Sequence, residues 1–262
     1  MKKVVVIGDI HGKSVWKEIV NKEADADTII FIGDYLDSWD ISPTMMAENF
    51  QEIVKFKKDS NKEVILLVGN HDLSYISSSC RCSGYNLELD SLIGRHITKL
   101  FNDKFIKTFH IEGNILFSHA GVTKSWLSNT VNYLNIESKN IFTQINIINS
   151  LVAETPSLLK YVAYDTSNRG FHIDQGPVWV RPPSLLENKL DTIEQVVGHT
   201  QYTDIYSKDN IHFIDVLDSV VQYLTIEFTN NQLYHKYIVK DIDIFQEEFD
   251  KIKITKTNAK NV

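Results

Sequence analysis

The first 120 residues alternate short apolar runs with segments of helical periodicity. The apolar runs are rich in Val and Ile, as buried strands of a largely parallel sheet are, and they cover residues 3–7, 28–32, 64–68 and 115–118. Between them, residues 14–22 and 43–57 have helical spacing, with Pro43 where a helix can begin. Strands that alternate with helices predict βαβ units and an α/β fold.

The last third of the chain is also rich in strand signals. Predicted strands cover residues 196–197, 211–214, 220–228 and 233–239. In residues 220–228, Leu224, Ile226 and Phe228 alternate with more polar neighbours, which predicts an antiparallel strand with one face exposed. Asn230 and Asn231 predict a turn after this strand. We therefore expect a second sheet that packs on the first.

Two long intervals, at about 73–109 and 122–175, interrupt this scheme, and the second contains a helical stretch at 140–152. We interpret both as insertions within a single domain of residues 1–262. Such insertions are expected to cap one edge of the sheets, where binding loops usually lie. The polar segment 251–262 is predicted to be a frayed tail.

Composition and charge narrow the classes of function. The chain has 262 residues, 43% of them apolar, which is ordinary for a globular protein. Its net charge of −7 and pI near 5.7 argue against broad nucleic-acid binding, which needs a basic surface. No apolar run is long enough for a membrane span or a signal peptide, so we expect a cytoplasmic protein without a membrane partner.

The two cysteines, Cys80 and Cys82, are separated by one residue. Reduced thiols are the expected state in the cytoplasm. Half of a metal site or a redox switch is the alternative, although no second cysteine pair exists to complete a metal site.

Polar residues of a restricted chemistry follow the apolar runs. They are Asp9 and His11, then Asp34 and Asp37, then Asn70, His71 and Asp72, then His119, and later His199. In a parallel α/β sheet the carboxyl ends of the strands face one crevice, so these residues are expected to converge. Carboxylates packed together without a cation repel one another, and divalent metal ions remove this penalty. Mixed His and carboxylate ligation suits Mn, Fe or Zn better than Ca.

Two other interpretations are weaker. The stretch GDIHGKS superficially resembles a P-loop, but only three residues separate Gly8 and Gly12, and Asp9 would repel a phosphate. Each polar residue alone also has a structural explanation, such as a helix N-cap for an aspartate. The joint pattern after so many apolar runs favours the metal centre.

The motifs GDIHG, GDYLD, GNHD, SHAG and GHT, in this order, resemble those of the calcineurin-like metallophosphoesterases. They are most similar to the branch of phosphoprotein phosphatases and bacterial symmetrical dinucleoside-tetraphosphate hydrolases, and they cover about residues 3–120 and 176–228. The resemblance implies a four-layer α/β/β/α sandwich of two mixed sheets, with helices on both faces and a dinuclear metal centre.

Matching positions imply a role for each site residue. Asp9 and His11 would hold the first metal ion, Asp34 would bridge to the second, and Asn70, His119 and His199 would complete the second site. His71 corresponds to the general acid of the family, and Asp37 to the carboxylate that orients it.

The implied activity is that of a metal-dependent phosphoesterase with two divalent ions, Mn being expected and Fe or Zn being alternatives. The ions would activate a water for in-line attack on phosphorus, while His71 protonates the leaving group. The expected partner is a phosphorylated substrate: a phosphoprotein, a nucleotide or a small phosphoester. A monoesterase resembling the protein serine/threonine phosphatases is favoured, and the alternatives are a dinucleoside polyphosphate hydrolase, a phosphodiesterase or a non-catalytic metal-binding scaffold.

The sequence departs from the family pattern in two places. Phosphoprotein phosphatases usually have Arg-Gly after the second motif, where this chain has Ser38 and Trp39, and the third motif ends in Asp72 in place of Glu. Trp39 could stack on a base or an aromatic leaving group, or it could be a core residue.

The chain has only four arginines, Arg81, Arg95, Arg169 and Arg181. Arg181, in GPVWVRPP, resembles the Trp-x-Arg element of the bacterial phosphatases and is the predicted phosphate clamp, because a guanidinium binds phosphate with two parallel hydrogen bonds. Arg81 or Arg169 could replace the missing arginine, or both could be solvated surface residues.

Overall fold

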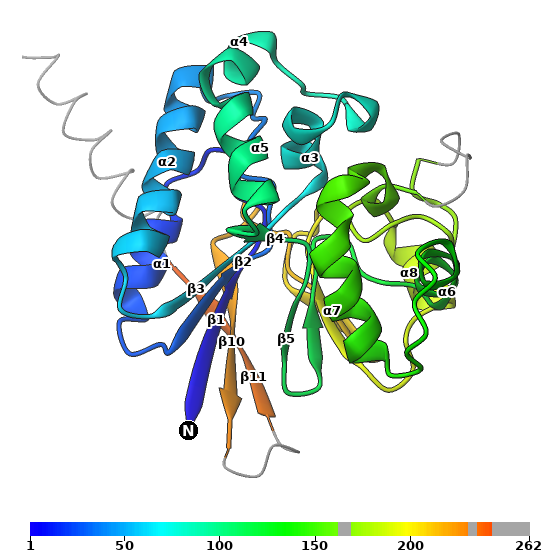
Figure 1. The fold of residues 1–262 in the computed structure, drawn as a ribbon. Coiled ribbons are helices and arrows are strands. Elements are labelled where there is room, and N and C mark those ends of the chain that lie inside the picture. The colour runs from blue at the N-terminus through cyan, green and yellow to red at the C-terminus, as the bar shows by residue number, and fades with distance from the viewer. Residues whose placement is uncertain (162–168, 230–234, 243–262) are drawn as a thin grey trace, which may run out of the picture.

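Two mixed β-sheets form the centre of the molecule, as seen in a computed structural model that describes residues 1–161, 169–229 and 235–242 (Figure 1). The first sheet has the strand order β11-β10-β1-β2-β3-β4, and the second has the order β5-β6-β7-β9-β8. The strands of the first sheet are β1 (Lys2–Ile7), β2 (Thr28–Phe31), β3 (Glu63–Leu67), β4 (Ile106–Lys107), β10 (Gln222–Phe228) and β11 (His235–Asp241). Those of the second are β5 (His110–Glu112), β6 (Ile115–Phe117), β7 (Glu194–Val197), β8 (Tyr206–Lys208) and β9 (Ile211–Phe213).

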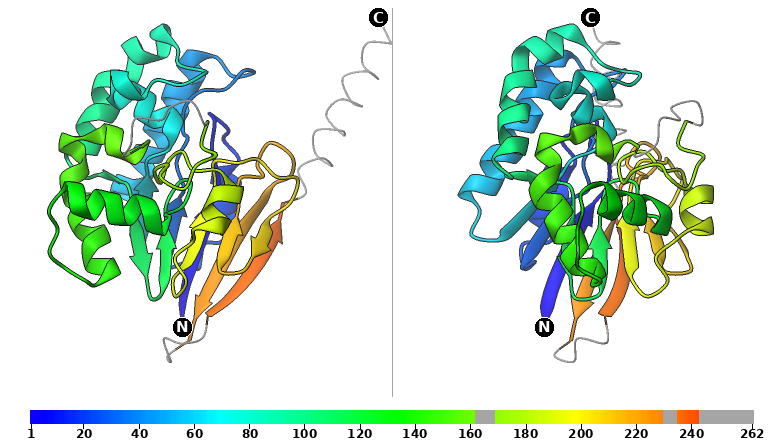
Figure 2. Two further views of the ribbon diagram at one scale, coloured as in Figure 1. Left: turned by 90° about the vertical axis from the view of Figure 1, so that its right-hand side faces the viewer. Right: turned by 45° about the vertical axis from the view of Figure 1, so that its right-hand side comes forward.

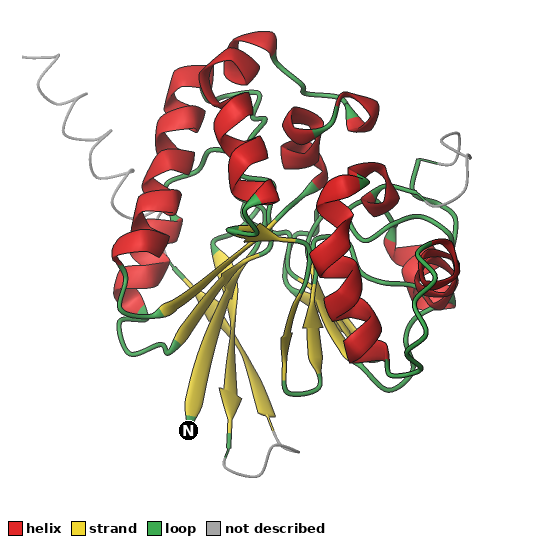
Figure 3. Ribbon diagram, viewed as in Figure 1, coloured by secondary structure: helices red, strands yellow, loops and turns green. Residues whose placement is uncertain are grey.

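Helices flank the sheets on both sides (Figure 3). They are α1 (Trp16–Lys22), α2 (Pro43–Asp59), α3 (Asn70–Ile76), α4 (Leu87–Leu89), α5 (Arg95–Asn102), α6 (Lys124–Tyr133), α7 (Ile141–Leu151) and α8 (Pro182–Glu187). Short 3₁₀ helices lie at Ser78–Cys80, Val152–Glu154 and Pro156–Leu159, and a π-helical segment at Asp90–Gly94. Local sequence sets several helix starts: Ser42, Thr123 and Asn140 each accept a backbone N–H of the first turn with the side-chain oxygen.

Apolar residues that alternate along the strands divide the core into layers. In β1, Val5 belongs to a cluster with Ile19 and Phe50 of the helix layer, whereas Val4 belongs to a cluster with Phe117 of the second sheet. On the other face of the second sheet, residues of β7 and β9 pack against α8. The views in Figures 1 and 2 show α1, α2 and α5 beside the first sheet and α6, α7 and α8 beside the second. The predicted four-layer α/β/β/α sandwich is therefore confirmed.

Three strands, β6, β10 and β11, lie in the other sheet from the one that the sequence predicted. β6 was expected in the first, parallel sheet, but it pairs parallel with β7 in the second sheet. β10 and β11 were expected in a second sheet, but β10 pairs antiparallel with β1, and β11 pairs with β10. Apolar periodicity identifies a strand without specifying its partner, because pairing is decided by contacts distant in sequence.

The predicted exposure of β10 is also wrong. Tyr223 and Thr225, on the face expected to meet water, are 0% exposed, and so is Ile226 on the opposite face. The strand lies inside the first sheet, with helices covering one face and the second sheet covering the other. Its antiparallel direction is as predicted.

The long intervals of the sequence contribute helices and one short strand. The interval 73–109 contains α4, α5 and β4, and β4 pairs parallel with β3. The interval 122–175 contains α6 and α7. Their role as insertions that cap an edge stays a prediction, and the turn at 230–231 and the tail at 251–262 lie outside the described residues. Of the helices that the structure describes, none combines the length and apolar character that a membrane span requires.

Because both faces of β10 are buried, truncating a side chain on either face should strongly destabilise the protein. We expect Tyr223→Ala and Leu224→Ala each to lower the free energy of unfolding by about 2–5 kcal/mol, measured by urea denaturation. Lys208→Ala, on the exposed strand β8, is the control and should change it by less than about 0.5 kcal/mol. A Tyr223→Ala variant as stable as the control would contradict the interior position of β10.

Candidate metal centre

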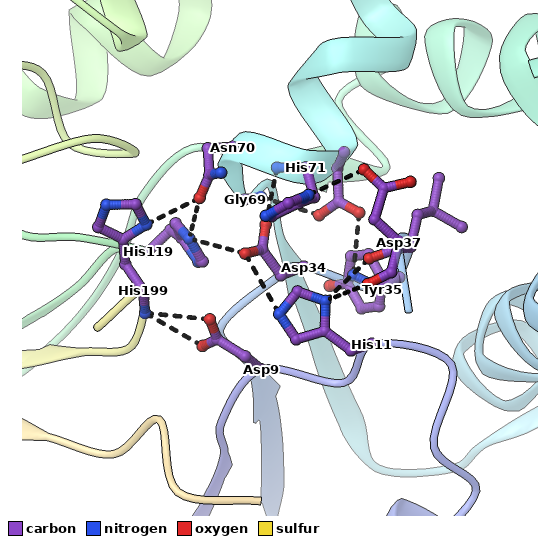
Figure 4. Close-up of polar contacts among 12 residues, drawn as sticks. Asp9, His11, Asp34, Tyr35, Asp37, Gly69, Asn70, His71, His119 and His199 are labelled. Atoms are coloured by element: carbon purple, nitrogen blue, oxygen red, sulfur yellow. Dashed lines mark hydrogen bonds and ion pairs between the residues drawn. The ribbon is translucent and has the colours of Figure 1, made fainter. Parts of the chain in front are cut away.

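Side chains that follow five strands converge at one end of the two sheets (Figure 4). Asp9 follows β1, Asp34 follows β2 and Asn70 follows β3, while His119 and His199 follow β6 and β7 of the second sheet. Two groups of possible metal ligands result: Asp9, His11 and Asp34, and Asp34, His119 and His199. Within each group the ligand atoms lie within 4.8 Å of one another, and Asp34 belongs to both.

Backbone amides hold the loops of this site together. The His11 N–H donates to the Asp34 carbonyl oxygen at 2.7 Å, and the His71 N–H donates to Asp34 Oδ1 at 2.9 Å. The His199 N–H lies 3.2 Å from Asp9 Oδ1 and 3.1 Å from Oδ2. The first and last motifs of the sequence are thereby joined at a distance of 190 residues along the chain.

Four site residues have a left-handed backbone. The φ angles are 42° at His11, 49° at Asp34, 62° at Asp37 and 67° at His199. This conformation costs a residue other than glycine about 1–2 kcal/mol, and it persists where surrounding contacts impose it. Its concentration in the loops after β1, β2 and β7 shows that the fold maintains strained turns to direct these side chains toward the centre.

Two glycines allow the carboxylates to approach the backbone. A Cβ added at Gly69 would lie 2.0 Å from Asp34 Oδ1, and one at Gly198 would lie 2.0 Å from Asp9 Oδ1. Neither distance is possible for real atoms, so any side chain at these positions would displace a carboxylate. The glycines of the GNHD and GHT motifs are therefore explained by the positions of Asp34 and Asp9.

The second donor group is arranged around Asn70. Its Oδ1 lies 2.9 Å from His119 Nε2 and 2.8 Å from His199 Nδ1. His119 Nε2 also lies 3.3 Å from Asp34 Oδ2, and the His119 Nδ1–H can donate to the Ile32 carbonyl at 3.2 Å. A histidine whose second ring nitrogen is hydrogen-bonded to a carbonyl is the usual arrangement of a metal ligand.

The first donor group repeats this arrangement. His11 Nδ1 lies 3.0 Å from the Leu36 carbonyl oxygen and 2.7 Å from that of Asp37. Its Nε2 is consequently directed toward Asp34, 3.8 Å from Oδ2. Asp9, buried next to it, supplies the third donor.

The electrostatics of the cluster favour cations. Burial and the neighbouring Asp215 raise the pKa of Asp9 well above its usual value. Burial acts in the same direction on Asp34, but His119, His71 and His11 hold its pKa below the usual range. Closely packed buried carboxylates and imidazoles with oxygen and nitrogen donors directed inward fit two divalent ions that share Asp34.

His71 lies outside both donor groups and is paired with Asp37. Its Nδ1 is 2.8 Å from Asp37 Oδ2, and the Tyr75 hydroxyl donates to the other oxygen of Asp37. Burial lowers the pKa of His71, but Asp34 and Asp37 outweigh it and raise the pKa to about 12. The side chain stays 21% exposed, so the imidazole paired with Asp37 lies at the accessible edge of the site.

Sequence reasoning missed Asp215 and Tyr75 near the centre, and it placed Asp72 there without a role. Asp72 is fully buried and accepts the Tyr35 N–H and the Gly69 N–H at 2.9 Å each. Asp215 is buried beside Asp9, and Tyr75 holds Asp37. Asp215 follows β9 as the other site residues follow their strands, so the same rule could have found it.

The predicted phosphate clamp lies beside the second donor group. The Arg181 guanidinium donates from Nη1 to the His199 carbonyl oxygen at 3.3 Å and to Thr200 Oγ1 at 3.1 Å. Arg181 and Arg169 line a cavity of about 310 Å³ with Thr200. Arg81 is exposed and lies over the Tyr85 ring at 4.2 Å, and its Nη2 donates to the Tyr85 hydroxyl at 2.9 Å.

Three further residues singled out in the sequence have defined positions. Trp39 is 89% exposed, so the interpretation of it as a core residue is wrong. Cys80 and Cys82 are free thiols, and Cys82 Sγ lies 3.6 Å from Asn70 Nδ2.

Comparisons with known proteins agree with this geometry. The family model of the calcineurin-like phosphoesterases matches residues 2–203. A search of curated proteins gave no match.

Among solved structures, an I115M mutant of a cold-active protein tyrosine phosphatase is similar with a TM-score of 0.55 and 19% identity, over 90% of this chain and 80% of that one. A Saccharomyces cerevisiae protein serine/threonine phosphatase with similarity to human phosphatase PP5 gives a TM-score of 0.50 and 13% identity, over 92% and 80% of the respective chains. These structures show that the fold is shared. The chain belongs to the calcineurin-like phosphoesterase family, whose members depend on two metal ions, and it is a phosphoester hydrolase.

Proposed function

We propose that the protein hydrolyses phosphate monoesters with the help of two bound divalent ions, and that these ions are Mn²⁺. Asp9, His11 and Asp34 would hold one ion, and Asp34, Asn70, His119 and His199 the other. The sharing of Asp34 by two donor groups is the observation that carries this proposal. When bound, such a pair of ions activates water for in-line attack and neutralises phosphate oxygens.

His71 would donate the proton that the leaving alkoxide needs. Its pairing with Asp37 keeps the imidazole protonated and fixes its orientation, and its exposed edge leaves it accessible to a substrate. A metal-binding scaffold without catalytic activity has no use for a proton donor held in this way. The pair of His71 and Asp37 therefore supports the enzyme over the scaffold.

Arg181 would bind the phosphate of the substrate. It is half-buried next to His199, and the cavity that it lines also has Arg169 in its wall, so two arginines face this space. Its contacts to the His199 carbonyl and Thr200 fix the guanidinium, which reduces the entropy lost when it binds an anion.

Asp34→Asn should abolish the binding of both ions, because the amide removes the charge that the two donor groups share. After loading with Mn²⁺, we expect the manganese content, measured by elemental analysis, to fall from about two ions per chain to fewer than about one. Asp59→Asn, an exposed carboxylate at the end of α2, is the control and should retain full loading. Unchanged metal content in Asp34→Asn would refute the shared position.

His71→Asn should retain both ions but hydrolyse substrates more slowly. The loss of turnover should be largest for substrates whose leaving group needs a proton to depart. For a phosphoserine peptide, we expect kcat to fall by about 10²–10⁴. For p-nitrophenyl phosphate the loss should be much smaller, because nitrophenolate departs without a proton. His96→Asn on α5 is the matched control. An equal loss on both substrates would show that His71 is not a general acid.

Arg181→Ala should weaken phosphate binding. Loss of a charge-assisted hydrogen bond predicts an increase of about 10- to 100-fold in KM for monoesters and in the Ki of inorganic phosphate. Arg181→Lys keeps the charge without the planar fork and should recover only part of the affinity. If the Ki of phosphate in Arg181→Ala equals that of the unaltered protein at equal metal content, Arg181 is not the clamp.

A further inference from the structure

A cavity of about 820 Å³ is lined by His71 and by His11 of the first donor group. His71 and Asp37 form part of its wall, together with Trp39, Ile41 and Met46. Its size is in the range of binding sites for small organic molecules. If His71 protonates the leaving oxygen, the rest of the leaving group must extend from that atom, and this cavity is the space that adjoins it.

Trp39 is the prominent feature of the cavity. Its side chain is 89% exposed, whereas Trp16 and Trp126 are 4% and 0% exposed in the core. An indole in water contributes nothing to the packing of the fold, but it presents a flat aromatic face to any ligand that enters the cavity. Partly buried Ile41 and buried Met46 add apolar surface on the same cavity.

The charges around the cavity disfavour an anionic leaving group. Lys13 also lines it, but its ammonium is in an ion pair with Asp218. Asp40, next to Trp39, is exposed and adds a negative charge, while the charge of Asp37 is matched by His71. A nucleoside polyphosphate that departs through this cavity would meet Asp40 with no unpaired lysine to offset it.

We propose that this cavity binds the leaving group, that Trp39 stacks on it, and that the substrates are phosphate monoesters whose leaving group carries an uncharged aromatic ring. The proposal rests on the proposed function of His71. In the reaction the ester P–O bond breaks, the water oxygen forms the new P–O bond, and the departing oxygen takes its proton from His71. A tyrosyl residue and a nucleoside both have this chemistry, and the experiment separates them.

A binding measurement tests the cavity without turnover. Phenylphosphonate, which cannot be hydrolysed at its P–C bond, is added to the Mn²⁺-loaded full chain, and acrylamide quenching of tryptophan fluorescence is recorded. We expect phenylphosphonate to protect the fluorescence of the exposed Trp39 from quenching by acrylamide, and methylphosphonate to give no protection. In Trp39→Phe, phenylphosphonate should no longer change the quenching. Inhibition of turnover by phenylphosphonate without any change in quenching would overturn the proposal.

A kinetic measurement tests the specificity. We expect the unaltered protein to prefer a phosphotyrosine peptide to a phosphoserine peptide of the same sequence, measured as the ratio of the two kcat/KM values. Trp39→Ala should lower this ratio by about tenfold, and Trp39→Phe should retain most of it. Tyr133→Ala, which removes an exposed aromatic side chain on α6, is the matched control and should leave the ratio unchanged. A ratio that is the same in Trp39→Ala and the unaltered protein would contradict the role of Trp39.

Two further substrates identify the source of the ring and test the charge argument. A nucleoside 5′-monophosphate that is hydrolysed faster than the phosphotyrosine peptide, with the same dependence on Trp39, would support a nucleoside as the leaving group. Dinucleoside tetraphosphate should be the poorest substrate, and Asp40→Asn should improve it relative to the peptide. A tetraphosphate preferred by the unaltered protein would overturn the proposal.

The two proposals fail in different ways. If metal-loaded protein hydrolyses none of these compounds, the proposed phosphatase function is wrong, while the quenching experiment still reports on the cavity. If it hydrolyses them without regard to Trp39, only the assignment of the cavity is wrong.

Discussion

The carboxylate of Asp34 connects the parts of the site. Its Oδ1 accepts the backbone N–H of His71, and its Oδ2 lies near His119 and His11. Two donor groups and the position of the proposed general acid therefore depend on one side chain. Placing this carboxylate requires β1, β2 and β3 side by side in parallel, and β6 and β7 in the facing sheet with their carboxyl ends at the same edge. The architecture of two facing sheets is what makes the convergence possible.

This arrangement has an energetic cost that the fold must offset. Burial and the proximity of Asp215 raise the pKa of Asp9, which means that its charged form is destabilised. Four site residues also have a left-handed backbone. Apolar layers on both sides of the first sheet and a network of amide donors to carboxylates hold the strained loops in place. Bound divalent cations would offset the remaining repulsion, so metal binding and stability are expected to be linked. A rigid frame of this kind positions ligands better than flexible loops would.

The parts of the fold that depend on local sequence were predictable, and those that depend on distant contacts were not. The convergence of Asp9, Asp34, Asn70, His119 and His199 could be predicted because each of them follows an apolar run closely in the sequence. The pairing of β10 with β1 could not be read in the same way, because it joins residues from opposite ends of the chain. The hydrogen bond from Tyr75 to Asp37 depends on how α3 packs, and the exposure of Trp39 depends on what covers its loop. Neither leaves a periodic signal in the sequence.

The anomalous X-ray diffraction of crystals of the Mn²⁺-loaded protein tests the central claim most directly. The account predicts two peaks about 3.5–4 Å apart, both in contact with the Asp34 carboxylate, with His11 beside one and His119 and His199 beside the other. A single peak that Asp34 does not contact, or no peak among these residues in protein shown to contain manganese, would contradict it.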